Sequence, residues 1–191
     1  NILSSKNLHV EPENRNISLS FQENALFPHF SIQRNINFGT ERNRMNGKKF
    51  LNPKKIIKIL NIENILDKYP HQISAGEAQR ASLTRAVISN PDLLLLDEPL
   101  SNIDENFKEE IQVNLKQILK ENKITTIIVT HDSYEAFYLG DKCGIILDKK
   151  LRQYDEPYNV YHYPNSVNVV NFLNRGCLLY TSPSPRDSIA S

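Results

Sequence analysis

Apolar runs of strand length are the feature that most constrains how this 191-residue chain folds. These runs, each bounded by helical or turn-like sequence, occur at residues 93–96, 124–129 and 144–147. A continuously apolar strand is typical of a parallel sheet that is covered on both faces. The runs therefore predict a sheet with helices on its two faces.

An amphipathic helix is predicted between the first two runs, over residues 104–122. Its apolar positions follow helical spacing, at Ile111, Leu115, Ile118 and Leu119. Strand, helix and strand in this order form a crossover between parallel neighbours, and ligands of such sheets gather at the carboxyl ends of the strands. The predicted fold class is therefore α/β, with a parallel sheet flanked by helices.

A strand with one buried face is predicted earlier in the chain, at residues 16–21. Apolar residues alternate there with polar ones, at Ile17, Leu19 and Phe21. This period of two is the pattern of a strand that buries one face. We expect these three side chains to point into the core.

A small helical subdomain is predicted to follow, from residue 26 to about residue 66. The chain is polar there and is interrupted by glycine and proline. Helical spacing then appears at Ile56, Ile59 and Leu60. Residues 40–53 have the weakest pattern, so we expect them to form a loop.

Bulk composition excludes several classes of protein. The 23 Lys and Arg residues nearly balance the 22 Asp and Glu residues, and 39% of the residues are hydrophobic. Neither an acidic disordered chain nor a strongly basic nucleic-acid binder is therefore expected. No purely apolar run exceeds five residues, which excludes a membrane-spanning helix of about 20 residues. The two cysteines, Cys143 and Cys177, have no metal-ligand spacing and indicate no disulfide framework.

Two acids, Asp97 and Glu98, directly follow the first apolar run. Carboxylates beside an apolar core are costly unless a cation or hydrogen bonds compensate them. In a nucleotide triphosphatase, the first acid of such a pair holds Mg²⁺ and the second polarises the attacking water. The alternative is a pair of acids that only caps a turn, and the pair alone does not decide between the two.

The segment Ser74-Ala75-Gly76-Glu77 precedes a helical stretch, residues 78–89. Its simplest interpretation is a capping box, in which Ser74 caps the helix and Glu77 reaches back to the backbone. The same helix N-terminus, with its free N–H groups and positive dipole end, is also suited to a phosphate. The segment alone favours the structural interpretation.

Two further polar residues are predicted at strand ends, His131 after the second apolar run and Gln22 after the strand at 16–21. The position of His131 places it at the same edge of the sheet as Asp97 and Glu98, where an imidazole can bond a phosphate or a water. Gln22 can ligate Mg²⁺ through its carbonyl oxygen. A lone histidine is more often structural, and Gln22 alone indicates nothing.

Taken together, five segments in a fixed order resemble the nucleotide-binding subunit of ATP-binding-cassette (ABC) transporters, over about residues 8–175. They are residues 21–23 (Q-loop), 73–77 (signature), 93–98 (Walker B strand), 101–104 (D-loop) and 130–132 (switch loop). The resemblance implies a P-loop NTPase core with an inserted helical subdomain at about residues 25–90. It also implies that residues 1–176 form part of a nucleotide-binding domain.

The resemblance implies ATP and Mg²⁺ as cofactors and assigns roles to single residues. Glu98 is the expected general base, His131 the switch residue near the γ-phosphate, Asp97 the Mg²⁺ partner, and Gln22 a contact to Mg²⁺ and water. In this family, two cassettes enclose two ATP molecules. The residues implied there are Ser74, Ala75, Gly76 and Glu77, near the ATP of the opposite subunit, and Asp104, at the dimer interface.

The partners implied by the resemblance are a second nucleotide-binding subunit, transmembrane permease subunits and, indirectly, a solute-binding protein. The expected location is peripheral, on the cytoplasmic face of a bacterial inner membrane. Residues 25–29 resemble the part of importer cassettes that cradles a permease helix. The motifs look most like importers of ferric iron, polyamines and sugars, and slightly favour ferric iron. The alternatives are a non-transport ATPase of the same superfamily, acting in DNA repair or on ribosomes, and an inactive remnant.

The sequence departs from the family pattern in three ways. The signature is commonly Leu-Ser-Gly-Gly-Gln, whereas Ala75 and Glu77 stand at its third and fifth positions. No Gly-x-x-x-x-Gly-Lys-Ser/Thr occurs, and Gly47-Lys48 comes nearest, so we expect the phosphate-binding loop upstream of Asn1 and little activity from this chain alone. Residues 177–191 resemble a translated sequencing adapter and are expected to be a non-native tail.

Overall fold

The structure is a computed structural model. It describes residues 4–5, 8–11, 15–21, 25–44 and 51–174. Gln22, the Gly47-Lys48 pair and the expected tail at 177–191 lie outside the described residues. The chain divides into two compact units, residues 1–131 and 132–191. The extent of the predicted domain, 1–176, and of its helical subdomain remain predictions.

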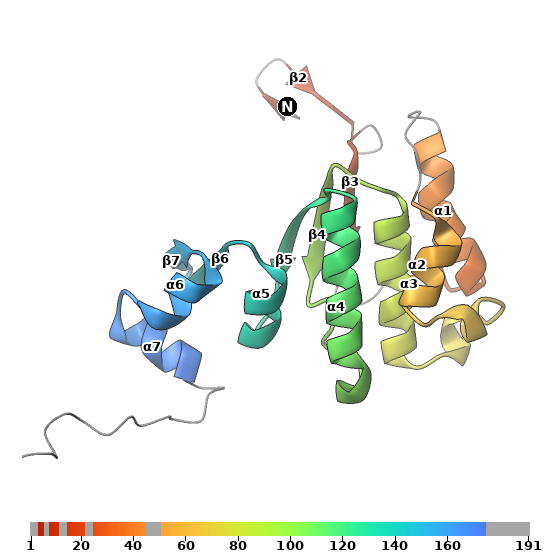
Figure 1. The fold of residues 1–191 in the computed structure, drawn as a ribbon. Coiled ribbons are helices and arrows are strands. Elements are labelled where there is room, and N and C mark those ends of the chain that lie inside the picture. Colours follow the sequence, from red (N-terminus) through yellow and green to blue (C-terminus); the bar gives the residue numbers. More distant parts are fainter. Residues whose placement is uncertain (1–3, 6–7, 12–14, 22–24, 45–50, 175–191) are drawn as a thin grey trace, which may run out of the picture. The chain divides into compact units, whose positions relative to one another are not determined.

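The elements follow one another along the chain as drawn in Figure 1. The strands are β1 Ser4–Ser5, β2 Leu8–His9, β3 Ile17–Ser20, β4 Leu93–Asp97, β5 Thr125–Val129, β6 Cys143–Leu147 and β7 Lys150–Asp155. The helices are α1 Ile32–Arg44, α2 Pro53–Ile59, α3 Ala75–Ile88, α4 Glu105–Glu121, α5 Ser133–Leu139, α6 Pro157–His162 and α7 Val167–Asn174, with short 3-10 helices η2 Glu63–Ile65 and η3 Pro70–Gln72.

The first unit contains a parallel sheet of three strands in the order β3-β4-β5. Leu95 of the central strand pairs with Leu19 on one side and Ile127 on the other. Helix α4 connects β4 to β5, so the predicted crossover is confirmed. The predicted helix stripe is buried at Ile111, Leu115 and Ile118. The carboxyl ends of all three strands therefore lie at one edge of the sheet.

The buried face of β3 is the opposite of the one predicted. Ser18 and Ser20 face α3, where their hydroxyls bond those of Ser89 (2.6 Å) and Ser82 (3.3 Å). Leu19, by contrast, is 41% exposed. Paired hydroxyls satisfy one another inside the core, so a small polar side chain can take the buried position of a strand.

Among the described residues, one face of the parallel sheet carries exposed apolar side chains. In Figure 1, α4 crosses in front of the strands and α3 lies beside them. Leu94 and Leu96 of β4 are buried on one face of the sheet. Exposed apolar side chains on or beside the other face are Leu19, Phe21, Ile127 and Val129. The prediction that the apolar runs are buried on both faces is therefore wrong for β5, because its Ile127 and Val129 side chains are 54% and 59% exposed.

Helix α1 occupies part of the segment that was expected to be a loop. It extends to Arg44, so the prediction of a loop over residues 40–53 is wrong for residues 40–44. Its buried positions include Ile32 and Ile36, one turn apart, and the helix packs against α3. The predicted helix near Ile56 is confirmed as α2, whose N-terminus is capped by an asparagine side chain.

Asn35 of α1 organises the loop that precedes the helix. The residue is fully buried, and its Oδ1 accepts a hydrogen bond from the backbone N–H of Phe27 at 2.8 Å. Its Nδ2 lies 3.1 Å from the carbonyl oxygen of Phe27, 3.2 Å from that of Phe30 and 3.1 Å from that of Ser31. One side chain thus satisfies several backbone groups of a loop that has no ladder partners.

The second unit contains a separate sheet of two antiparallel strands, β6 and β7. The third apolar run lies in β6, so the prediction that it joins the parallel sheet is wrong. Its pattern is also half-exposed, because Ile145 is buried while Ile146 is 68% exposed. The core of this unit consists of Cys143, Ile145, Val160, Val169 and Leu173. Among the described helices of the chain, none is long and apolar enough to cross a membrane.

Candidate active site

Parallel pairing of β4 with β5 brings the two acids and the histidine to one edge of the sheet. Asp97 is the last residue of β4 and pairs with Val129, the last residue of β5. The next residue, Glu98, donates its backbone N–H to the carbonyl oxygen of Val129 at 2.8 Å. His131 follows β5 after one intervening residue. The predicted neighbourhood of these side chains is therefore present in the structure.

Glu98 and His131 are in direct contact. One carboxylate oxygen of Glu98, Oε1, accepts the backbone N–H of His131 at 3.0 Å, and the Nδ1 atom of His131 lies 2.8 Å from Oε1 and 2.7 Å from Oε2. Because a carboxylate only accepts, Nδ1 carries the hydrogen of this bond. The Glu98 side chain is 15% exposed and the His131 side chain 79% exposed, so the carboxylate is sheltered while the imidazole faces solvent.

The backbone of Glu98 adopts a left-handed conformation, with φ of 47°. A non-glycine residue pays about 1–3 kcal/mol for such a conformation, and these residues concentrate at functional sites. The carbonyl oxygen of Glu98 accepts hydrogen bonds from the Ser101 hydroxyl at 3.0 Å and from Nε2 of Gln79. These bonds hold the turn in its strained form.

Gln79 is a residue that the sequence analysis missed. It lies on α3 and is 2% exposed, and its Oε1 accepts the backbone N–H of Asn102 at 2.8 Å. A glutamine among polar helix residues carries no local pattern that indicates burial. Only the placement of α3 against the turn that follows β4 shows the contact.

The capping box predicted at the start of α3 is confirmed. The Ser74 hydroxyl accepts the backbone N–H of Glu77 at 3.2 Å, and the Glu77 carboxylate accepts the backbone N–H of Ser74 at 2.8 Å. The bond from the Ser74 backbone lowers the pKa of Glu77 below its ordinary value, with a smaller contribution from the Ser74 hydroxyl. Ala75 is the first residue of the helix and has no positive φ, so alanine is compatible with this position.

Replacing Glu77 should reveal the contribution of this cap. Glu77→Ala removes the acceptor of the Ser74 N–H, and we expect the free energy of unfolding to fall by about 0.5–1 kcal/mol. Glu77→Gln keeps an acceptor but cannot titrate. Because the folded-state pKa of Glu77 is depressed, its ionised form stabilises the fold above the ordinary pKa, and this stabilisation is lost as the pH falls through the folded value.

Urea unfolding of the purified chain at ~pH 7 and ~pH 3.5 measures both effects. At the higher pH the parent should have a larger free energy of unfolding than Glu77→Gln, and this difference should shrink at the lower pH. Equal stability of the parent and Glu77→Ala at the higher pH would contradict the role of the cap.

A second group of the predicted residues surrounds the turn after β4. Gly76 lies so close to this turn that a Cβ atom there would come within 2.7 Å of the carbonyl oxygen of Asn102. Asp104 caps α4, where its Oδ1 accepts the backbone N–H of Asn106 at 2.9 Å. The signature segment and the segment 101–104 are therefore neighbours within one chain. Their proposed contacts with an opposite subunit remain predictions.

Asp97 places one carboxylate at the sheet edge where the sequence predicts a magnesium ion. The described residues contain no cluster of three or more His, Cys, Asp or Glu side chains that could hold a metal ion. Mg²⁺ does not need such a cluster, since it is usually bound by one or two carboxylates together with phosphates and water. The single carboxylate of Asp97, at the carboxyl end of a parallel strand, fits that pattern.

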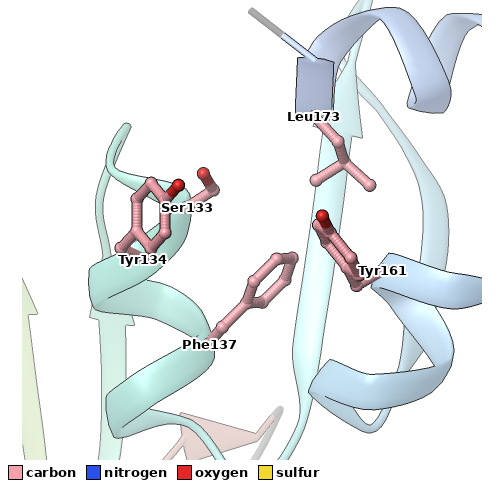
Figure 2. Close-up of a pocket in the computed structure, with 5 residues that line it drawn as sticks. All are labelled: Ser133, Tyr134, Phe137, Tyr161 and Leu173. Carbon is pink, nitrogen blue, oxygen red and sulfur yellow. The ribbon is translucent and has the colours of Figure 1, made fainter. Parts of the chain in front are cut away.

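A small pocket lies in the second unit, as Figure 2 shows. Its volume is about 110 Å³, and its lining consists of Ser133, Tyr134, Phe137, Tyr161 and Leu173. Ligand pockets typically measure about 300–1,000 Å³. The pocket is too small, and its lining too poor in charge, for a nucleotide.

Comparison with known proteins identifies the family. The sequence pattern described as "ABC transporter" matches residues 3–101, just over half of the chain. The chain belongs to the ABC transporter family. The signature, the strand β4 and the start of the turn after it lie within the matched segment, as the resemblance in the sequence indicated.

The curated relatives of this ABC transporter chain are ATP-binding proteins of import systems. The "Fe(3+) ions import ATP-binding protein" of Fusobacterium nucleatum is 33% identical over 87% of this chain and 45% of its own length. The "sn-glycerol-3-phosphate import ATP-binding protein" of Vibrio vulnificus is 36% identical over 93% of this chain and 48% of its own length. The chain thus spans about half the length of these relatives.

A solved structure supports the fold of the ABC transporter chain. A dimeric ATP-binding cassette, described in a post-hydrolysis state with ADP and Pi, superposes with a TM-score of 0.64. The superposition covers 75% of this chain and 63% of the solved one, at 23% identity. The predicted fold class, an α/β P-loop NTPase core, is confirmed.

Proposed function

We propose that this chain is part of the ATP-hydrolysing subunit of an ABC import system. The observation that carries the proposal is the contact between Glu98 and His131 at the carboxyl edge of the parallel sheet. This is the edge at which ligands of α/β proteins bind. The contact joins a sheltered carboxylate, which can accept a proton from water, to an accessible imidazole, which can bond a phosphate.

Each side chain of this edge has a proposed role in the reaction of ATP with water. Glu98 accepts the proton of the attacking water, and its carboxylate has about four acceptor sites, so the bonds from His131 leave room for that water. His131 orients the carboxylate and lies near the γ-phosphate. Mg²⁺, held by Asp97 and Gln22, would neutralise charge on the phosphates.

The opposite subunit completes the proposed site. Residues Ser74, Ala75, Gly76 and Glu77 present the N-terminus of α3, whose N–H groups and dipole attract an anion. We propose that this surface faces ATP held by a second copy and that Asp104 lies at the interface between the copies. The dimeric state of the solved cassette supports this arrangement.

The proposed partners beyond the dimer are permease subunits and, through them, a solute-binding protein, on the cytoplasmic face of a bacterial inner membrane. The names of the relatives support import rather than a role in DNA repair or on ribosomes. These relatives import ferric iron, glycerol phosphate or pentoses. Ferric iron is the solute that we propose, and the test below measures its uptake.

A chimera tests the proposal directly. Residues 8–174 replace the matching segment of the Fusobacterium nucleatum relative, which supplies the rest of the subunit. We expect the purified chimera to hydrolyse ATP only with Mg²⁺, and to restore uptake of ferric iron to cells that lack the relative. The relative itself is the positive control. A folded chimera without Mg²⁺-dependent hydrolysis contradicts the proposed activity, whereas hydrolysis without iron uptake contradicts only the proposed solute.

A further inference from the structure

We propose that Gln79 is a positioning residue for Glu98, a role that rests on the proposed function of Glu98 as the general base. Gln79 is 2% exposed and reaches from α3 to the turn that follows β4. Its amide donates through Nε2 to the carbonyl oxygen of Glu98 and accepts through Oε1 from the backbone N–H of Asn102. The donor and the acceptor of one buried side-chain amide therefore both bond the backbone of the turn that follows β4.

The contact matters because Glu98 is held in a conformation that it does not favour. With φ of 47°, its carbonyl oxygen points toward α3. A buried carbonyl without a partner would add a desolvation penalty to the backbone strain. The Gln79 amide and the Ser101 hydroxyl share the removal of that penalty, and Gln79 is the one that ties the carbonyl to α3. The amide therefore favours the strained conformation over a relaxed one.

The conformation of the backbone decides where the carboxylate lies. In the observed state, Glu98 is bonded to β5 through its N–H and to His131 through its carboxylate. A change of φ at this residue rotates the side chain about the N–Cα bond, away from His131. Loss of the Gln79 amide should therefore displace the carboxylate of Glu98, although Glu98 itself is not substituted.

The same residue connects the turn to the signature segment. Gln79 lies one turn of α3 after Gly76, which packs against the carbonyl of Asn102. The Gln79 side chain and the Gly76 backbone thus fix the start of α3 and the turn as one body. This body contains both the proposed base and the segment proposed to face the opposite ATP.

Two substitutions in the chimera test the donor and the acceptor of the Gln79 amide separately. Gln79→Met keeps the length of the side chain and removes both hydrogen bonds. Gln79→Glu keeps an acceptor for the Asn102 N–H but loses the donor to the Glu98 carbonyl. If the donor positions the base, both should lower kcat by about tenfold or more while the KM for ATP stays within about threefold. Gln117→Met, which changes an exposed glutamine of α4, is the matched control and should stay within about twofold of the parent.

A double-mutant cycle with Glu98→Gln distinguishes positioning from general loss of structure. Once the base is absent, its position no longer matters, so Gln79→Met should lower the remaining turnover by less than about twofold. The inference would be overturned if Gln79→Met lowered kcat by the same factor with and without Glu98→Gln. A kcat of Gln79→Met near that of the parent would also overturn it. If Gln79→Met does not fold, the cycle is measured with Gln79→Glu instead, and its kcat values are judged in the same way. Full turnover in Glu98→Gln alone would instead overturn the proposed function, and the inference with it.

Discussion

Replacing Glu98 with glutamine in the chimera should lower ATP turnover by about 100-fold or more and leave nucleotide binding within about threefold. General-base catalysis typically contributes ~10²–10⁴ to a rate, and an amide cannot accept the proton. The glutamine keeps the length of the side chain and an oxygen that can accept the backbone N–H of His131. The change therefore removes the general base while the hydrogen bond to the backbone N–H of His131 can remain.

Steady-state hydrolysis and equilibrium titration with a nucleotide measure the two effects separately. Glu110→Gln, the same change at an exposed position of α4, is the control and should match the parent. Turnover of Glu98→Gln within about threefold of the parent would refute the assigned role. His131→Ala should also lower turnover, because it removes the side chain that contacts the carboxylate.

Among the substitutions considered for stability, replacing Asn35 with alanine should lower the free energy of unfolding the most. The change removes a fully buried amide, together with the bonds that it makes to the backbone N–H of Phe27 and to the carbonyl oxygen of Phe30. Each buried group left unsatisfied costs about 1–3 kcal/mol, although the loop relaxes in part. We expect the free energy of unfolding to fall by about 2–4 kcal/mol, which corresponds to a drop in Tm of about 5 °C or more.

Scanning calorimetry of the chimera measures this drop. Asn37→Ala is the matched control, because Asn37 lies on the same helix, is partly buried and accepts a bond from Gln33. Its expected cost is about 1 kcal/mol or less. Equal effects of the two changes would show that the Asn35 contacts do not hold the loop. Residues 25–29 resemble the part of importer cassettes that cradles a permease helix, so Asn35→Ala should also weaken iron uptake more than ATP hydrolysis.

The strongly periodic elements were predictable from the sequence. Helix α4 and the strands β4 and β5 were located because a period of 3.6 and continuous apolar runs leave few alternatives. The adjacency of Glu98 and His131 followed from the same prediction, since Glu98 directly follows β4 and His131 follows β5 after one residue, and the two strands are parallel neighbours. The start of α3 was predictable because a capping box is a local signal.

Other features depend on contacts between distant segments. The face that β3 buries is decided by hydroxyl pairs with α3 rather than by its own alternation. Helix α1 was missed because a buried asparagine occupies a position of its inner face, between Ile32 and Ile36. The antiparallel partner of β6 is the next strand along the chain, which apolar content alone does not reveal.

In the candidate site, Gln79 and the left-handed backbone of Glu98 were equally inaccessible to sequence analysis. Neither residue type indicates its conformation or burial. Both become visible only when α3 is placed against the turn after β4. The chemistry at the strand ends was therefore predictable, and the residue that supports it was not.

The close approach of Gly76 to the carbonyl of Asn102 also decides how the signature segment can vary among related sequences. Any side chain at this position would collide with main-chain atoms, which cannot move aside as a flexible side chain can. The flanking residues, Ala75 and Glu77, already differ from the usual glycine and glutamine of the family, and both differences fit the start of α3. Substitutions in this segment should therefore be tolerated at Ala75 and Glu77 rather than at Gly76. A library of variants would retain glycine at position 76 even under selection for folding alone, before any nucleotide is considered.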